Sequence, residues 1–230
     1  MKINRLFSAF CIASILAIFV SCAQNTPQIH AHHTVRLAVQ EPDGSFSERL
    51  SLFIHSSDDD SDDDFYAIRF EHQSTGLYWT LDRAGVSVRM RGKDRWLGSA
   101  SLAGPGGGPI PSGEYRVSVY DLAGKEAVRT VRLGEFRLPE EPPAKLVFTG
   151  TDWILQRSEN AGPYRRIFLY LFAQNGTLLH SWRVPLNSDG RANGTSASLK
   201  SMAREAFTVQ CYVEDDTGSA AVLLTPVEIP

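Results

Sequence analysis

The chain has 230 residues, of which 43% are hydrophobic and 21% are charged. This composition is ordinary for a globular protein and argues against wholesale disorder, and the length suffices for one large or two small β domains. The formal net charge of −3, without a basic stripe, argues against nucleic acid as a partner.

The first residues have the pattern of an export signal. Lys2 and Arg5 precede an apolar run from Leu6 to Val20, which is short for a bilayer span and typical of a signal peptide. The run ends in Phe-Val-Ser-Cys, which resembles the lipobox of bacterial lipoproteins, where the cysteine is acylated before cleavage. The resemblance implies a signal peptide at 1–21 and a lipid on Cys22. Such a lipid would anchor the protein to a membrane of the bacterial cell envelope, facing the periplasm or the cell surface.

A second interpretation of this segment stays open. Ser21, Cys22 and Ala23 also fit the small-x-small site of an ordinary signal peptidase. Cleavage there would release a soluble secreted protein that begins at Gln24. A third interpretation is an uncleaved anchor. The interpretations differ in whether and how the protein stays on a membrane.

Residues 22–33 are polar and contain a proline, which predicts a tether between the anchor and the folded part. His30, His32 and His33 lie close together in it. Three such histidines could hold a metal ion loosely, but a solvated linker is the simpler interpretation.

Residues 34–139 are predicted as a first β-sandwich. Apolar and polar residues alternate with a period of two in a series of short runs, without a convincing helix between them. These runs lie at 35–39, 50–54, 66–70, 77–81, 86–90, 115–119 and 131–133. Turn residues separate them, and Asp121 to Gly124 forms the clearest turn, between the last two runs. Many short strands with turns at close intervals are the pattern of a sandwich.

Two resemblances concern this region. Gly113-Glu114-Tyr115-Arg116-Val117 resembles the G-x-Y-x-V entry to a strand of immunoglobulin-like and fibronectin type III-like modules, in which the tyrosine ties a corner to nearby backbone. The order of the segments LYWTLD, RWLGSASL and PSGEYRVSVYDLAGKEA within residues 58–133 resembles lipoproteins of treponeme-type spirochaetes, a family without an assigned activity. These resemblances imply a fold and a location but no catalysis.

The segment Asp58–Asp64 holds six carboxylates in seven residues. Like charges repel, so such a segment is solvated, surrounds a cation or contacts a basic partner. Calcium would be bound by carboxylate oxygens, and the candidate ligands are Asp58, Asp60, Asp62 and Asp64. The EF-hand pattern fails here, because Asp63 stands at its glycine position. A plain solvated loop is the simpler interpretation, so no cofactor is expected, with calcium as the alternative.

Residues 140–144 are predicted as a stiff proline-rich linker, and residues 145–230 as a second β-sandwich. The run 167–172 is apolar at every position, which predicts a central strand covered on both faces. Asn175-Gly176 predicts a hairpin after it. We expect about one helical turn within 199–206, then a hairpin from Phe207 that repeats the one at Tyr115. The last strand is expected at 222–227, with Pro226 indicating an edge position.

Cys211 is the single cysteine beyond the leader. It shares a predicted strand face with Phe207, Val209 and Val213, so it is expected to be a small buried hydrophobe, with a reactive thiol as the alternative.

The expected fold is all-β, with two tandem immunoglobulin-like or fibronectin type III-like sandwiches after a lipoprotein signal peptide. Motif searches find no phosphate-binding loop, nucleophile elbow or metal-protease spacing. We therefore expect a non-enzyme: a lipid-anchored binding or scaffold module of the envelope that contacts a protein or a glycan. The alternatives are an envelope hydrolase or carbohydrate-active protein with a site near Trp79, Trp96 and the acidic cluster, and a calcium-braced structural protein.

Overall fold

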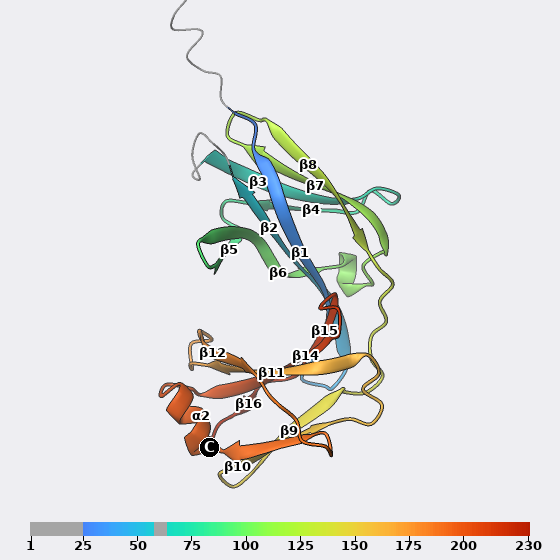
Figure 1. Ribbon diagram of the computed structural model, residues 1–230. Coiled ribbons are helices and arrows are strands. Elements are labelled where there is room, and N and C mark those ends of the chain that lie inside the picture. The colour runs from blue at the N-terminus through green and yellow to red at the C-terminus, as the bar shows by residue number, and fades with distance from the viewer. Residues whose placement is uncertain (1–24, 58–63) are drawn as a thin grey trace, which may run out of the picture.

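The computed structural model describes residues 25–57 and 64–230, and its fold is all-β (Figure 1). We call the part up to Leu133 the upper half and the part from Ala144 the lower half. The upper half contains β1 (Gln28–Gln40), β2 (Phe46–Ser57), β3 (Phe65–His72), β4 (Tyr78–Asp82), β5 (Ser87–Arg91), β6 (Asp94–Ala103), the 3₁₀ turn η2 (Pro105–Gly107), β7 (Gly113–Asp121) and β8 (Glu126–Leu133). The lower half contains β9 (Ala144–Thr149), β10 (Asp152–Arg157), β11 (Tyr164–Phe172), β12 (Leu178–Arg183), β13 (Arg191–Thr195), α2 (Ser196–Met202), β14 (Thr208–Asp215), β15 (Ala220–Leu223) and β16 (Val227–Glu228).

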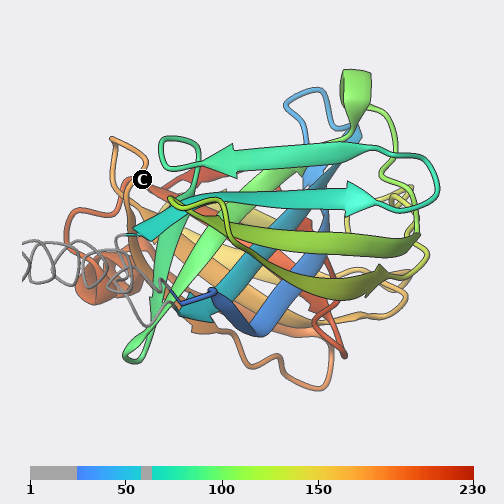
Figure 2. The ribbon, with the colours of Figure 1, turned by 90° about the horizontal axis from the view of Figure 1, so that it is seen from above.

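One sheet runs through both halves. Its nine strands have the order β12-β11-β14-β15-β1-β2-β6-β5, with β16 paired to β14. The two halves meet where β1 pairs in parallel with β15, over residues 36–39 and 220–223. A four-stranded sheet, β4-β3-β7-β8, covers this sheet in the upper half, and a three-stranded sheet, β13-β10-β9, covers it in the lower half (Figures 1 and 2).

Each half has its own core on the covered side of the long sheet. Leu50, Leu52 and Ile54 of β2 pack with β3 and β7 in the upper core, whereas Ile167 and Leu169 of β11 pack in the lower core. Because side chains alternate across a strand, the residues between these point to the other face of the sheet. That second face is not covered by either small sheet.

Pro226 suggested an edge position for the last long strand, and this prediction is wrong. β15 lies between β14 and β1, and Val222 within it is fully buried. The strand is held from both sides because β1, the first strand of the chain, fills the position beside it. Pro226 itself follows β15, in the short link to β16.

The strand β1 also differs from the simple alternation that its sequence predicts. Val35, Arg36, Leu37 and Ala38 are all buried, so both faces are covered at this point. The strand begins at Gln28, and residues 28–33, which the sequence places in the polar tether, pair with β2. Ladder hydrogen bonds to β2 therefore order a segment whose composition alone predicts a linker.

The hairpin β7–β8 forms as predicted. Tyr115 and Val117 are fully buried, and Gly124 has φ 82° in the turn. The Tyr115 hydroxyl donates a hydrogen bond to the carbonyl oxygen of Pro111 at 2.7 Å. This is the corner contact that the G-x-Y-x-V resemblance implies.

Other expectations hold in part. The hairpin at Asn175-Gly176 joins β11 to β12, and α2 supplies the helical turn, three residues earlier than expected. The helix starts there because Thr195 and Ser198 form a capping box. β11 lies between two strands, as expected, but one of its faces is only half-buried. β5 carries no core face, since Val88 and Met90 are 51% and 64% exposed.

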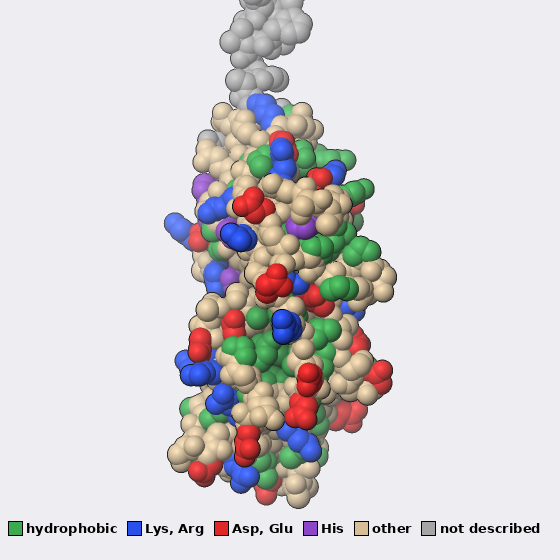
Figure 3. Space-filling model, turned by 90° about the vertical axis from the view of Figure 1, so that its right-hand side faces the viewer, with side chains coloured by type: hydrophobic (Ala, Val, Ile, Leu, Met, Phe, Trp, Pro, Cys, Tyr) green, Lys and Arg blue, Asp and Glu red, His purple; other side chains and the backbone are tan. Residues whose placement is uncertain are grey.

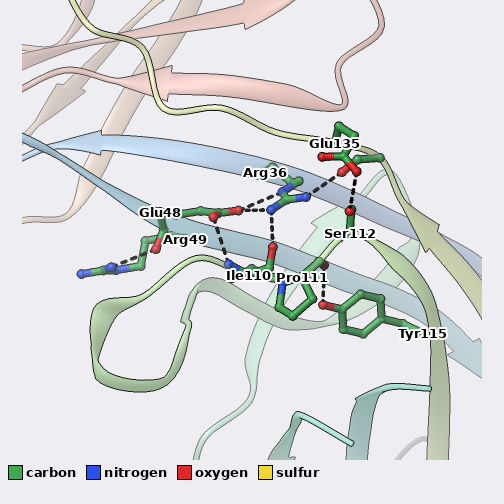
Figure 4. A network of polar contacts seen from close by, with 9 residues as sticks. Arg36, Glu48, Arg49, Ile110, Pro111, Ser112, Tyr115 and Glu135 are labelled. Carbon is green, nitrogen blue, oxygen red and sulfur yellow. Dashed lines mark hydrogen bonds and ion pairs between the residues drawn. The ribbon is translucent and has the colours of Figure 1, made fainter. Parts of the chain in front are cut away.

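A buried ion pair lies where the halves meet (Figure 4). Arg36 of β1 donates from Nε to Glu48 Oε1 of β2 at 2.8 Å, and its other nitrogens donate to the carbonyl oxygens of Gly134 and Ile110. The second oxygen of Glu48 accepts from the Ile110 amide at 3.0 Å. Both charges are thereby satisfied, which is the condition for burying them. The pair fixes the loop before β7 and the start of the connection to the lower half.

Candidate binding face

The lipidation residue and most of the acidic loop lie outside the described part of the chain. Cys22, Asp58, Asp60 and Asp62 are among these residues, so the structure tests neither the anchor nor the calcium loop. Asp64 is described; its carbonyl oxygen accepts from the Leu122 amide at 2.9 Å, next to β3. Within residues 25–57 and 64–230, no group of three metal-type side chains is placed to hold an ion.

The three histidines near the N-terminus do not form one cluster. His32 lies opposite Ile54 on the side of the upper core, and His33 lies opposite Phe53 on the other side of the sheet. His30 instead approaches His55, with 5.1 Å between the ring centroids. Since β1 sends neighbouring side chains to opposite faces, the three rings cannot share one ion.

The uncovered side of the long sheet carries arginine and aromatic side chains in the upper half. Arg89 of β5 lies over the Phe53 ring of β2, with Cζ 3.9 Å from its centroid, and Arg91 lies 5.5 Å from the Trp96 ring. Together with His33 and Met90 they line a cavity of about 140 Å³. The ring faces attract the guanidinium groups and hold them over the sheet.

The same side of the sheet continues with aromatic residues in the lower half. Phe168 lies opposite Tyr212 across β11 and β14, so both side chains share a face. Tyr170 stacks on Tyr212 with centroids 5.5 Å apart. Burial raises the pKa of both tyrosines, and the charge of Arg89 acts in the opposite direction on each. Arg89 therefore lies near the lower aromatic residues as well as over Phe53.

We call this surface the arginine–aromatic face and define it by His33, Phe53, Arg89, Arg91, Trp96, Phe168, Tyr170 and Tyr212. Val35, Leu37 and Ala221 form a small buried cluster between its upper and lower parts, with Tyr212 packed against it. The face is thus continuous across the junction of β1 and β15.

Positive charge exceeds negative charge on this face: Arg89, Arg91 and Arg166 lie there with two carboxylates, Glu214 opposite Arg166 and Asp94 opposite Arg91. Among the residues that the structure describes, Glu214 is the acidic residue of this face that forms an ion pair. Its Oε1 atom lies 3.2 Å from Arg166 Nη2. Within the same residues, Arg89 and Arg91 contact rings and have no ion pair. Burial lowers the pKa of His33, and the nearby positive charges of Arg91 and Arg89 lower it further. The face therefore suits a ligand with negative charge and apolar groups.

A larger cavity lies elsewhere, between the turn after β1, the proline-rich connection and the segment before β16. Its volume is about 600 Å³, and Cys211 lies at its wall. Polar side chains of this cavity bond to the segments that enclose it: Ser158 donates to the Pro142 carbonyl oxygen at 2.6 Å, and Gln40 accepts from the Thr225 amide. These contacts hold the walls together.

Figure 3 shows hydrophobic side chains gathered on the lower half of the side that it views, with charged groups around them.

Cys211 is buried, as predicted. Burial raises the pKa of its thiol to about 12, so the group stays protonated and unreactive at neutral pH.

The two tryptophans proposed for a sugar site lie apart. Trp79 donates from Nε1 to the Ala103 carbonyl oxygen at 2.8 Å and packs against the upper core. Trp96 lies on the uncovered face, stacked on His55 at 5.6 Å. They do not form one platform for a sugar ring.

Sequence reasoning missed the arginine–aromatic face. The sequence suggested core strands at 86–90 and 167–172, and no spacing connects segments about 80 residues apart. A signal was present in the apolar run of β11, because aromatic residues occupy its alternate positions Phe168, Tyr170 and Phe172.

No family model matches the chain, and no curated protein matches it. The solved structures that are similar to it include two of low identity. Tp47, the 47-kilodalton lipoprotein of Treponema pallidum, has 13% identity and a TM-score of 0.39, over 87% of this chain and 50% of that chain. Dimeric latent PorU from Porphyromonas gingivalis has 12% identity and a TM-score of 0.33, over 90% of this chain and 21% of that chain.

The chain therefore spans half the length of the Treponema lipoprotein and about a fifth of PorU. With both TM-scores below 0.5, neither likeness supports an assignment of function. No helix within the described ranges has the length and hydrophobicity needed to cross a bilayer.

Proposed function

We propose that this chain is a non-catalytic binding or scaffold module of a bacterial cell envelope, anchored by a lipid on Cys22 and acting through protein or glycan contacts. In this proposal the two halves are tandem immunoglobulin-like or fibronectin type III-like sandwiches that present a shared surface. The observation that carries it is the arginine–aromatic face, which both halves build on the uncovered side of one sheet.

Such a face suits recognition. Aromatic and arginine side chains are enriched where proteins bind partners, because they combine large contact areas with directed polar groups. The buried pair of Arg36 and Glu48 holds the connection between the halves, which favours a fixed surface over a flexible one. A lipid anchor is supported by the Phe-Val-Ser-Cys sequence at the end of the apolar leader.

The anchor is tested with the full chain expressed in a bacterium that acylates lipoproteins. Intact mass and detergent partitioning are compared for the wild type and Cys22→Ala. We expect a lipid mass on the wild type and its loss in the variant. A mature wild-type protein that starts at Gln24 without lipid would overturn the anchor.

The binding role is tested by capture of envelope proteins and glycans on the purified chain. We expect a partner whose capture falls at least about fivefold in Arg89→Gln/Trp96→Ala and persists in the control Arg132→Gln, which changes an exposed arginine of β8. Equal capture by both variants would remove the arginine–aromatic face from the binding role.

A further inference from the structure

The strand β5 ends the nine-stranded sheet. Among the described strands it pairs only with β6, from Ser87 opposite Gly98 to Arg91 opposite Asp94. All five of its residues are exposed, and it lies at the left margin of the upper half in Figure 1. An edge strand presents backbone N–H and C=O groups that can pair with one more strand.

The two faces of this edge differ in chemistry. Arg89 and Arg91 share the face of Trp96, next to the cavity of about 140 Å³. Val88 lies opposite Leu97, on the side of the upper core. Met90 follows it in the alternation, although it also borders the cavity. Val88 and Met90 are nevertheless 51% and 64% exposed, because the core does not extend to the edge.

We propose that the free edge of β5 binds an extended peptide segment of a partner protein in which acidic and apolar residues alternate. In an added strand, alternate side chains lie beside Arg89 and Arg91, and the others lie beside Val88 and Met90. The guanidinium groups of Arg89 and Arg91 lie inward, over the Phe53 and Trp96 rings. Acidic residues at every second position of the added strand share their face and draw the exposed arginine side chains outward into ion pairs, while the intervening apolar residues cover the exposed valine and methionine. This proposal rests on the proposed binding function and names the class of partner.

Charge decides against a second copy of this chain as the occupant. If two β5 strands paired edge to edge, arginine side chains would stand opposite arginine side chains, and neither copy would supply a carboxylate to draw them from the Phe53 and Trp96 rings. A glycan, in turn, has no backbone that continues the strand ladder. An acidic peptide uses both the free backbone groups and the arginines, which have no ion pair within the described residues.

The test uses labelled eight-residue peptides and the full chain in detergent. The first peptide alternates glutamate and valine, and the second has the same composition with glutamates and valines in blocks. Fluorescence anisotropy gives the two dissociation constants. We expect the alternating peptide to bind at least about tenfold more tightly, because block order places half of the side chains on the wrong face. We also expect weaker binding at higher salt.

Variants locate the peptide. Arg89→Gln/Arg91→Gln keeps most of each side-chain stem and removes both charges, and we expect at least about tenfold weaker binding. Arg132→Gln/Arg137→Gln removes the same charge from exposed positions outside β5 and should bind as the wild type does. The bound peptide should also slow amide exchange within residues 86–92, a readout that needs no variant.

Equal affinity for the two peptides, or unchanged exchange within residues 86–92, would overturn the proposal; the edge arginines would then serve only to prevent strand pairing. The binding module itself is judged separately. A captured envelope partner that depends on Arg89 and Trp96 but is not displaced by the alternating peptide would leave the proposed function standing and remove this inference.

Discussion

The guanidinium of Arg36 lies 2.5 Å from the carboxylate of Glu48, and both side chains are more than nine-tenths buried. The pair lies on β1 and β2, between the upper and lower cores, and binds the backbone at Ile110 and Gly134 (Figure 4). The Arg36 guanidinium also lies 5.2 Å from the Phe136 ring of the connecting segment. One ion pair thus joins two strands, one loop and the connection between the halves.

Removing one partner of this pair should be costly. Glu48→Gln leaves the Arg36 charge buried without compensation, and we expect a loss of about 3–5 kcal/mol in the free energy of unfolding, measured in urea. The matched control is Asp216→Asn, which breaks a pair with Arg165 whose side chains are both 63% exposed. That change should cost less than about 1 kcal/mol. Similar losses in the two variants would contradict a special role for Arg36 and Glu48.

Gly98 should tolerate no side chain. A Cβ atom at this position would lie 1.9 Å from the carbonyl oxygen of Leu52, so Gly98→Ala forces β6 away from β2. We expect a loss of about 3 kcal/mol or more in thermal or urea unfolding. Gly134→Ala is the control, because nothing lies within 4 Å of its Cβ, and it should stay within about 0.5 kcal/mol of the wild type. A fully stable Gly98→Ala protein would show that the two strands separate easily.

Tyr115 should stabilise the folded protein through its corner hydrogen bond, and its raised pKa should make that stability depend on pH. Tyr115→Phe removes the bond to Pro111 and should cost about 1 kcal/mol at pH 7. Burial raises the pKa of Tyr115 to about 12, partly opposed by Arg36. The unfolded chain releases this proton first, so stability is full below pH 10 and falls as the pH rises toward 12.

The free energy of unfolding of Tyr115→Phe should therefore fall less than that of the wild type between pH 10 and 12. Urea unfolding at several pH values measures this difference. Tyr66→Phe is the control, since Tyr66 is 55% exposed. An unchanged alkaline slope in Tyr115→Phe would assign that slope to other groups.

Cys211 should be inert in the folded protein. Its thiol is 1% exposed, and burial raises its pKa to about 12. A thiol reagent at pH 8 should label the wild type only as fast as the protein unfolds, and rapidly in urea. Fast labelling without denaturant would show that the 600 Å³ cavity opens to the thiol.

His33 should make the protein sensitive to acid. Burial lowers its pKa first, and Arg91, Arg89 and His32 add to the effect. The unfolded chain then takes up the proton at higher pH, so stability is full above pH 6.5 and declines as the pH falls through the lower native pKa. His33→Gln should reduce this decline between pH 6.5 and 5, whereas His180→Gln, at an exposed position, should not. Parallel declines in the three proteins would exclude His33 as a cause.

Local sequence determined much of the fold. Alternating runs predicted most of the strands, and Asn175-Gly176 and Asp121–Gly124 predicted two turns. The G-x-Y-x-V segment predicted the Tyr115 corner. These features depend on neighbouring residues, whose side-chain period and backbone preferences are written directly in the chain. The burial of Cys211 followed from its strand face in the same way.

The tertiary structure alone decided how the halves are joined and where the candidate face lies. The pairing of β1 with β15 connects residues about 185 apart, and it buries Arg36 and Ala38 on a face that the sequence presents as partly polar. It also brings Arg89 close to Tyr170 and Tyr212. Side-chain period tells which residues share a face of one strand, but it carries no information about which distant strands become neighbours.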